Sequence, residues 1–220
     1  RRSRVVVDCE YIGGGFGSKF QIGKEGAAAG LAAKSSGKPV YSFCDRREEH
    51  LDTGNRPSLL CKVKLGHDAD GTIRGARLET FGGTGVSSRG GGARVPSGRF
   101  DFGAVDGRNH QDVQFNAGGP RAMRAPGCPQ GAFVEELMLD EIAHRCGVDP
   151  LALRRRLDDS KRRGEMYDVA ARLIGWSARP ETGSQDGPMR TGYGIATCDW
   201  GKGRAPAKIE VVVHPDGHLE

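Results

Sequence analysis

The clearest hydrophobic pattern lies in the middle of the chain and predicts an amphipathic helix. Apolar residues recur there at helical spacing, at Phe133, Val134, Leu137, Met138 and Ile142. Acidic residues occupy positions between them, at Glu135, Glu136, Asp140 and Glu141. Residues three or four positions apart share a helix face, so this spacing separates an apolar face from an acidic one. We therefore expect this helix to pack by its apolar face, with the acidic residues on the other side.

Two further stretches have the composition of helices. Residues 25–34 are rich in small side chains, which favours a helix that packs closely against its neighbours. Residues 165–174 form another predicted helix, which ends where Gly175 and Trp176 follow.

A short helix is predicted after Asp149 and Pro150. An aspartate caps free amides at a helix start, and proline fits the first helical position because its missing N–H is not needed there. The predicted helix covers residues 151–157 and carries three consecutive arginines at residues 154–156. We expect these arginines to form a solvated face.

An antiparallel hairpin is predicted between residues 62 and 81. Residues 62–65 and 73–81 alternate in polarity, which is the pattern of half-buried strands. The Asp70-Gly71 pair between them is a strong signal for a tight turn. Residues 82–98 then form a predicted loop.

Shorter strands are predicted on either side of this hairpin. They are residues 5–7 with 11–12, residues 39–43, residues 113–115, residues 191–199 and residues 207–213, the last followed by a turn at 215–217. The first two would be parallel if the helix between them is a crossover. The expected fold class is therefore α+β, with mixed sheets and packed helices.

The order of these elements predicts two units. The first covers residues 1–158, and the second covers residues 159–220, with the polar, Pro- and Gly-rich residues 179–190 as a linker. The chain opens on a predicted strand and stops after a turn, where a partner strand should begin. We therefore expect an internal piece of a longer polypeptide, truncated at both ends, in which some strands lack neighbours.

The composition narrows the class of protein. The chain has 220 residues, 35 glycines and a net charge of +5, with a pI near 9.0. Glycine is about twice as frequent as the usual share, which indicates many loops and close backbone approaches. No run of about 18 apolar residues occurs, so we expect no membrane span. The six cysteines show no zinc or iron–sulfur spacing and are expected to be buried or free thiols.

The glycine-rich segment GGGFGSK at residues 13–19 matches neither common nucleotide fingerprint. Ser18 separates Gly17 from Lys19, which breaks a P-loop, and Ser18 also stands where the dinucleotide motif requires glycine. Two interpretations stay open. The segment is either a plain turn between a strand and a helix or a backbone cradle for a polar ligand, with Phe16 as a wedge or lid.

Two charged segments also allow alternatives. The run DRREEH at residues 45–50 is either a solvated face or an ordered corner held by internal ion pairs, and a turn follows at residues 54–58. The run RGGGAR at residues 89–94 resembles an RNA-binding segment. It occurs once, lacks interleaved aromatic residues and lies between strands, so nucleic acid is not the expected partner.

The loop before the amphipathic helix has the properties of an anion site. It contains three glycines, three prolines and two arginines: Gly118, Gly119, Gly127, Pro120, Pro126, Pro129, Arg121 and Arg124. The glycines allow close backbone approach, the prolines stiffen the path, and the arginines add permanent positive charge. A helix N-terminus presents free amides, so a stiff cationic loop at that position suits an anion.

Four blocks of sequence, in order, resemble the molybdenum-cofactor-binding subunit of the aldehyde oxidase/xanthine dehydrogenase family. They are GGGFGSK at residues 13–19, DRREEHLDTGNRPS at 45–58, AMRAPGCPQ at 122–130 with the helix behind it, and DPLALR with IGW at 149–154 and 174–176. The first and third blocks are similar to the family's two cofactor loops. The resemblance covers nearly the whole chain.

This resemblance implies a molybdenum–molybdopterin cofactor, which bacterial members commonly use in its cytosine dinucleotide form. By motif position, the cofactor-binding residues are Gly15, Phe16, Gly17, Ala122, Met123 and Arg124. The amides of Gly17, Ala122 and Arg124 would donate to ligands of the metal. No side chain of this chain is expected to bind the metal directly.

The resemblance also implies a reaction. Family members hydroxylate a small molecule with oxygen from water, and the electrons leave through iron–sulfur clusters and FAD on partner domains or subunits, so a hetero-oligomer is expected. Their catalytic base is a glutamate in a Gly-Val-Gly-Glu type motif, which this sequence lacks. We therefore assign no catalytic residue and expect the chain alone to be inactive. Both cytoplasmic and periplasmic locations stay open.

Two departures from the family's motifs narrow the expected substrate. Purine-oxidising members have a glutamate directly after the lysine of the first loop, where this chain has Phe20. Carbon-monoxide-oxidising members have a cysteine after the arginine of the second loop, where this chain has Ala125. An aldehyde is therefore favoured, then a non-purine N-heterocycle, with Phe20 and Pro126 in the substrate pocket. A non-catalytic structural member and a basic Gly-rich nucleic-acid binder are the alternatives.

Overall fold

The computed structural model describes residues 5–86, 92–93, 95–113, 118–200 and 210–218. Its elements are α1 (Lys24–Ser36), α2 (Arg46–Asp52), β1 (Leu59–His67), β2 (Ile73–Gly83), β3 (Ala104–Val113), α3 (Cys128–Cys146), α4 (Pro150–Leu157), α5 (Lys161–Leu173) and the 3-10 turn η2 (Trp176–Ala178). The predicted α+β class with a mixed sheet is confirmed. The predicted helices are present, and α5 starts four residues earlier than expected because Ser160 caps it.

The three strands form one mixed sheet in the order β1-β2-β3. β1 and β2 are the predicted hairpin, paired antiparallel, and the turn between them is closed by a 2.9 Å bond from the Gly71 amide to the Asp68 carbonyl. β2 and β3 are parallel. The strand predicted at 113–115 starts too late, because β3 already begins at Ala104; residues 114 and 115 of that prediction lie outside the described residues. β3 was missed because its exposed, polar sequence carries no alternation.

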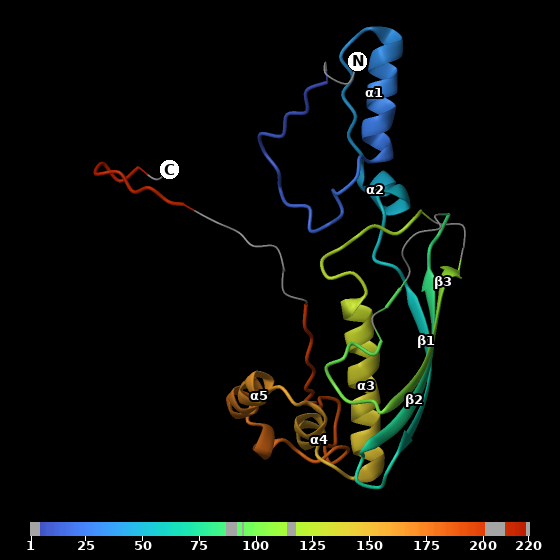
Figure 1. Cartoon of the computed structure of the whole chain (residues 1–220), viewed down its shortest axis with the longest axis vertical. Helices are drawn as coiled ribbons and strands as arrows, with labels where there is room; N and C mark the ends of the chain where they lie inside the picture. The colour runs from blue at the N-terminus through green and yellow to red at the C-terminus, as the bar shows by residue number, and fades with distance from the viewer. Residues whose placement is uncertain (1–4, 87–91, 94, 114–117, 201–209, 219–220) are drawn as a thin grey trace.

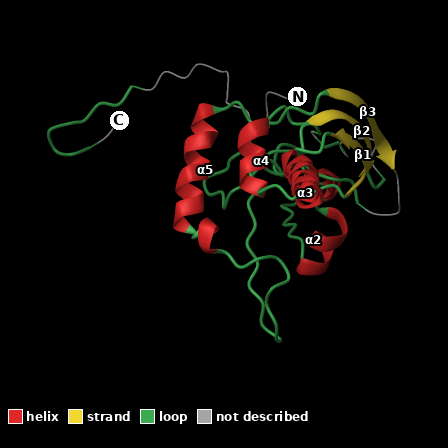
Figure 2. Cartoon of the chain, turned by 90° about the horizontal axis from the view of Figure 1, so that it is seen from below, coloured by secondary structure: helices red, strands yellow, loops and turns green. Residues whose placement is uncertain are grey.

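The core lies between this sheet and α3. From the sheet outward, α3, α4 and α5 follow in that order (Figures 1 and 2). The buried apolar side chains come from β2, the loop before β3, α3 and α4: Ile73, Ala76, Leu78, Phe100, Phe102, Met138, Leu139, Ile142, Ala143, Leu153 and Leu157. The long central helix is therefore held on both sides, and its N-terminal end is the one that meets the second predicted cofactor loop.

The acidic face predicted for α3 is not a solvent face. Glu135 is fully buried and Glu136 is 5% exposed, whereas Phe133 of the predicted apolar face is 67% exposed. Arg99 donates to Glu135 at 2.6 Å, and the Arg154 guanidinium Nε donates to Glu136 at 2.8 Å. These ion pairs offset the cost of burying the carboxylates. The expectation of a solvated face at 154–156 is likewise wrong for Arg154, which is fully buried.

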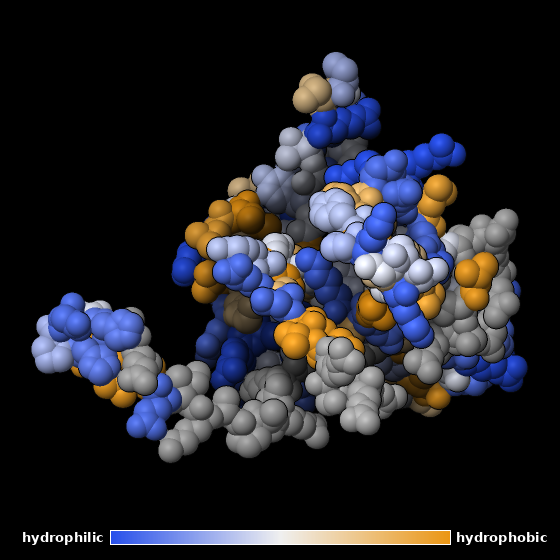
Figure 3. Space-filling view, turned by 90° about the horizontal axis from the view of Figure 1, so that it is seen from above, coloured by the Kyte–Doolittle hydropathy of each residue, from blue (hydrophilic) through white to orange (hydrophobic). Residues whose placement is uncertain are grey.

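The N-terminal part differs most from the prediction. Residues 5–12 and 39–43 form no strand. Helix α1 is present, but none of its residues is buried, and it stands at the end of the molecule opposite α4 and α5 (Figure 1). Seen from this end, the surface has several hydrophobic residues (Figure 3). Val6 is 90% exposed and Phe43 is 77% exposed. A strand needs a hydrogen-bonding neighbour, and the described part of the chain supplies none here.

The charged run after residue 44 becomes helix α2. The Asp45 side chain accepts from the Glu48 amide at 2.8 Å, the Glu48 carboxylate accepts from the Asp45 amide at 2.9 Å, and Arg46 pairs with Glu49 at 3.0 Å. No residue of this helix is buried. The segment is therefore an ordered corner that is also solvent-exposed, so both interpretations of the run hold in part.

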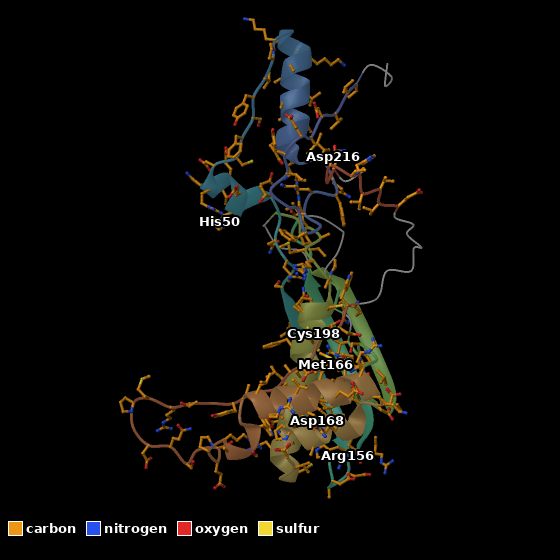
Figure 4. The ribbon with its side chains drawn as sticks, turned by 90° about the vertical axis from the view of Figure 1, so that its left-hand side faces the viewer. His50, Arg156, Met166, Asp168, Cys198 and Asp216 are labelled. Atoms are coloured by element: carbon orange, nitrogen blue, oxygen red, sulfur yellow. The ribbon has the colours of Figure 1, made fainter. Side chains whose placement is uncertain are left out.

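The predicted strands of the second unit are not formed in the described residues. Residues 191–199 are irregular, and of the strand predicted at 207–213 the described residues show only an isolated bridge at Val213. The turn at 215–217 is present. Residues 194–198 lie against α3, where Cys198 marks them in Figure 4. No helix in the described part of the chain is both long and apolar enough to cross a membrane.

Candidate cofactor site

The first predicted loop folds into a tight turn. The Ser18 amide donates to the Gly15 carbonyl at 2.9 Å, and the Ser18 hydroxyl donates to the same oxygen at 2.8 Å. Phe16 and Gly17 both have positive φ, of 53° and 105°. Left-handed backbone is costly for a phenylalanine, so surrounding contacts must hold Phe16 in place. Phe16 as a whole is 60% exposed.

The second predicted loop ends in a similar way at the start of α3. Ala125 has a φ of 58° and Gly127, the N-cap of α3, a φ of 79°. The Cys128 amide donates to the Ala125 carbonyl at 3.0 Å. The loop therefore turns sharply just before the helix, and this bend carries residues 122–126 past the helix N-terminus.

The two loops are in direct contact. The Arg124 amide donates to the Phe16 carbonyl at 2.6 Å. A Cβ at Gly17 would lie 3.2 Å from the Ala122 carbonyl oxygen, so the backbone of the second loop closes the space that a side chain would need. The fold thus brings together the two motifs that the family resemblance assigned to one cofactor. In this structure the Arg124 amide donates to the first loop, and not to a ligand of the metal as the resemblance implied for it.

A third segment, the turn at residues 54–58, holds the second loop in place. The Arg121 amide donates to the Asn55 carbonyl at 3.1 Å, and the Arg56 guanidinium donates to the Arg124 carbonyl at 2.8 Å. The Gln130 side chain donates to the Pro57 carbonyl at 3.1 Å. No site role was predicted for this turn from the sequence. The only available signal was its place in the second resembling block, between the two cofactor loops.

These three segments, together with Gly92, line a cavity of about 440 Å³. It is lined by Gly17, Ser18, Phe20, Gln21, Arg56, Pro57, Gly92, Pro120, Arg121, Ala122, Met123, Pro126 and Gly127. Five of the residues assigned from the sequence are therefore in its wall: Gly17, Phe20, Ala122, Met123 and Pro126. Gly15, Phe16 and Arg124 belong to the same loops but do not line it.

The charged side chains that line the cavity are all positive among the described residues. Arg56 and Arg121 contribute two guanidinium groups, and no carboxylate occurs among the described residues that line it. The amides of Gly17, Ala122 and Met123 donate to no protein acceptor in the described part of the chain. Positive charge together with free backbone donors suits an anionic or oxygen-rich group. The residues present therefore fit a cofactor that carries phosphate and oxygen ligands.

Comparison with known proteins agrees with this geometry. The sequence model of a family described as "Molybdopterin cofactor-binding domain" matches residues 1–157. That match covers more than half of the chain and includes all three segments of the cavity. This chain belongs to the molybdopterin cofactor-binding domain family. The family resemblance expected from the four sequence blocks is confirmed.

Relatives with curated descriptions include two molybdenum-binding subunits from Escherichia coli. The xanthine dehydrogenase molybdenum-binding subunit of strain O157:H7 is 28% identical over 231 residues, covering 95% of this chain and 30% of the relative. The aldehyde oxidoreductase molybdenum-binding subunit of strain K12 is 28% identical over 209 residues, covering 87% of this chain and 28% of the relative. The chain spans less than a third of the length of these relatives.

Solved structures confirm the fold. The aldehyde oxidoreductase from Desulfovibrio gigas matches with a TM-score of 0.59 and 28% identity, over 68% of this chain and 17% of that chain. Quinoline 2-oxidoreductase from Pseudomonas putida 86 matches with a TM-score of 0.66 and 20% identity, over 76% of this chain and 24% of that chain. At this identity the second match shows the fold alone.

Proposed function

We propose that this chain is part of the molybdopterin-binding subunit of a molybdenum hydroxylase that oxidises an aldehyde with oxygen derived from water. The observation that carries the proposal is the contact between the two loops, with the Arg124 amide on the Phe16 carbonyl and Gly17 against Ala122. This contact joins two motifs far apart in the sequence around one cationic cavity. The family membership and the relatives' descriptions as molybdenum-binding subunits support it.

The residues proposed to hold the cofactor are those assigned from the sequence, Gly15, Phe16, Gly17, Ala122, Met123 and Arg124. When bound, the molybdenum–molybdopterin group supplies the redox chemistry of the hydroxylation. The chain supplies the positions of the donors. The Gly17 and Ala122 amides have no acceptor among the described residues, and the left-handed turns at Phe16 and Ala125 set the path of the loops. The cofactor is proposed to be the cytosine dinucleotide form, because the sequence resembles that of bacterial members, which commonly use this form.

Phe20 and Pro126 are proposed to shape the substrate pocket. Both line the cavity beside the cofactor loops, and Phe20 is 83% exposed, which leaves its ring free to contact a bound molecule. An aromatic ring and a proline offer apolar contact and no hydrogen bond to a heterocycle edge. This favours an aldehyde over a purine, with a non-purine N-heterocycle as the second substrate class.

The proposal also covers the domain division of the chain and its partner domains or subunits. We divide the chain at residues 1–158 and 159–220, the second part being a linker and the start of another cofactor-binding domain. Iron–sulfur clusters and FAD on partner domains or subunits would take the electrons, in a hetero-oligomer located in the cytoplasm or periplasm. No residue of this chain is proposed as the catalytic base, so the chain alone should not catalyse hydroxylation.

Metal and pterin analysis of the natural protein, purified with its neighbouring subunits, tests the proposal. The expected result is about one molybdenum per subunit, releasable cytidine nucleotide, and oxidation of aldehydes that Arg124→Ala reduces. A protein without molybdenum, isolated from cells that make the cofactor, would overturn it in favour of the non-catalytic structural alternative.

A further inference from the structure

Two arginines that line the cavity differ from the other buried or partly buried arginines in their ion pairing. In the described part of the chain, six arginine residues are at least partly buried: Arg56, Arg99, Arg121, Arg154, Arg163 and Arg179. Four of these form ion pairs with carboxylates, at distances from 2.5 to 2.8 Å: Arg99, Arg154, Arg163 and Arg179. Arg56 and Arg121 pair with no carboxylate among the described residues. Both line the cavity.

Each of the two guanidinium groups is held by one hydrogen bond to a backbone carbonyl. Arg56 donates to Arg124 at 2.8 Å, and Arg121 donates to Ser18 at 3.3 Å. A guanidinium has five N–H donors in a planar fork. The remaining donors of Arg56 and Arg121 have no protein acceptor within the described residues. The backbone thus positions both groups and leaves most of their hydrogen-bonding capacity unused.

An unpaired cation that is partly withdrawn from water loses hydration that the protein does not replace. Elsewhere in this fold a buried arginine receives a carboxylate, as Arg99 does from Glu135. The wall of this cavity has no carboxylate to offer among its described residues. A bound molecule with a negative charge can therefore act as the counter-ion of Arg56 and Arg121.

We propose that Arg56 and Arg121 form an oxyanion subsite of this cavity that takes a carboxylate or a phosphate group. Planar guanidinium groups bind either oxyanion through paired, charge-assisted hydrogen bonds. The identity of the ligand rests on the proposed function: the oxyanion is either a phosphate of the cofactor or a carboxylate on the substrate. Neither arginine belongs to the residues assigned to the cofactor from the sequence.

Three variants of the natural protein, purified with its subunits, separate these sources. Arg121→Gln removes the charge but keeps an amide donor for the Ser18 carbonyl. Arg56→Lys keeps the charge but loses the planar fork. Arg108→Gln, on β3, removes the same charge from an exposed position outside the cavity and is the matched control.

The measurements are molybdenum and cytidine nucleotide content, and KM for benzaldehyde and 4-carboxybenzaldehyde. If the oxyanion is on the substrate, Arg121→Gln raises KM for the carboxylated aldehyde by about 10- to 100-fold, the range for one charged hydrogen bond, and leaves benzaldehyde unchanged. If it belongs to the cofactor, molybdenum and nucleotide content fall several-fold and the KM ratio stays constant. Arg56→Lys shifts the same quantity by a smaller factor. An Arg121→Gln protein that equals Arg108→Gln in both measurements overturns the subsite.

Failure of the proposed function is seen separately, in the unaltered protein. If that protein holds no molybdenum and oxidises neither aldehyde, the subsite is tested on the same cofactor-free protein by calorimetric titration with benzoate and inorganic pyrophosphate. The expected result is binding of at least one anion that Arg121→Gln weakens about 10- to 100-fold and Arg108→Gln does not. No binding, or equal binding by the two variants, overturns the proposal.

Discussion

Glu136 on α3 accepts two hydrogen bonds from Thr197, one from its amide at 3.0 Å and one from its hydroxyl at 2.8 Å. The other carboxylate oxygen accepts from Arg154 on α4 at 2.8 Å. One buried carboxylate therefore joins α3, α4 and the irregular segment at 194–199. Because α3 begins at the second predicted cofactor loop, these contacts also anchor the helix that meets the cavity.

Replacing Thr197 with valine tests the anchoring role of Glu136. Thr197→Val keeps the side-chain shape but removes the hydroxyl, so Glu136 loses one donor while staying buried. We expect the free energy of unfolding to fall by about 1–3 kcal/mol, measured by urea denaturation, with faster protease cleavage near residue 197. Thr197→Ser keeps the hydroxyl and is the control. Equal stability of the two variants would show that the hydroxyl contributes nothing.

The buried pair of Glu135 and Arg99 predicts a larger effect. Glu135 also accepts from the Ser97 hydroxyl at 2.7 Å, and neither charged side chain has appreciable exposure. Glu135→Gln leaves Arg99 buried without its main counter-charge, so we expect a loss of about 3–5 kcal/mol.

Glu141→Gln is the control for this prediction. Glu141 pairs with Arg145 at 2.6 Å on the exposed side of the same helix. Surface pairs of this kind contribute about 0.5 kcal/mol or less, and so the control should unfold close to the unaltered protein. The prediction is wrong if the two variants lose similar stability in the same denaturation experiment.

Gly17 is predicted to tolerate no side chain. Its φ of 105° disfavours any other residue, and a Cβ there would press on the Ala122 carbonyl at 3.2 Å. Gly17→Ala should lower the molybdenum content of the purified protein several-fold and cost about 1–3 kcal/mol of local stability. Gly13→Ala in the same loop meets nothing within 4 Å and serves as control. Full metal content in Gly17→Ala would contradict the close contact between the loops.

Asp158 predicts how stability changes in acid. Burial alone raises its pKa, but the Arg163 guanidinium at 2.7 Å and the Ser160 amide at 2.9 Å outweigh burial, so its pKa lies below the ordinary value of 3.8. A carboxyl with a lowered pKa stabilises the fold above its unfolded pKa and loses that contribution as pH falls through the folded value.

Unfolding free energies measured from pH 6 to about pH 2, the range in which carboxyl groups titrate, test the contribution of Asp158 to stability. Asp158→Asn should be less stable at pH 6 and should show a shallower loss of stability below about pH 4. Asp159→Asn, at the exposed neighbouring position, is the control and should follow the unaltered protein. Identical slopes for Asp158→Asn and the unaltered protein would rule out the proposed linkage.

Local signals in the sequence were enough to predict the hairpin and the helices α1, α3, α4 and α5, but not α2. Asp149 accepts from the Ala152 amide at 2.9 Å, and the Asp70 carboxylate accepts from the Thr72 amide at 2.9 Å. Both interactions join residues two or three positions apart, so a short stretch of sequence contains all that they require. The same holds for the motif blocks, whose residue types and spacing are sufficient to indicate the family.

The predicted strands at 5–12, 39–43 and 191–199 failed for the opposite reason. A strand's hydrogen bonds come from a neighbour that its own sequence does not specify. The described residues give these segments no such neighbour, and Thr197 is held by side chains instead.

The sequence by itself determined the motif blocks that indicate the family and the approximate positions of α1, α3, α4 and α5. Tertiary structure alone decided that Glu135 and Glu136 are buried, because their partners Arg99 and Arg154 come from other segments. It also decided that Arg56, 68 positions before Arg124, shares a cavity with the second loop. Side-chain types set what each group is able to bind, but burial and charge pairing depend on distant residues, which only the folded chain brings together.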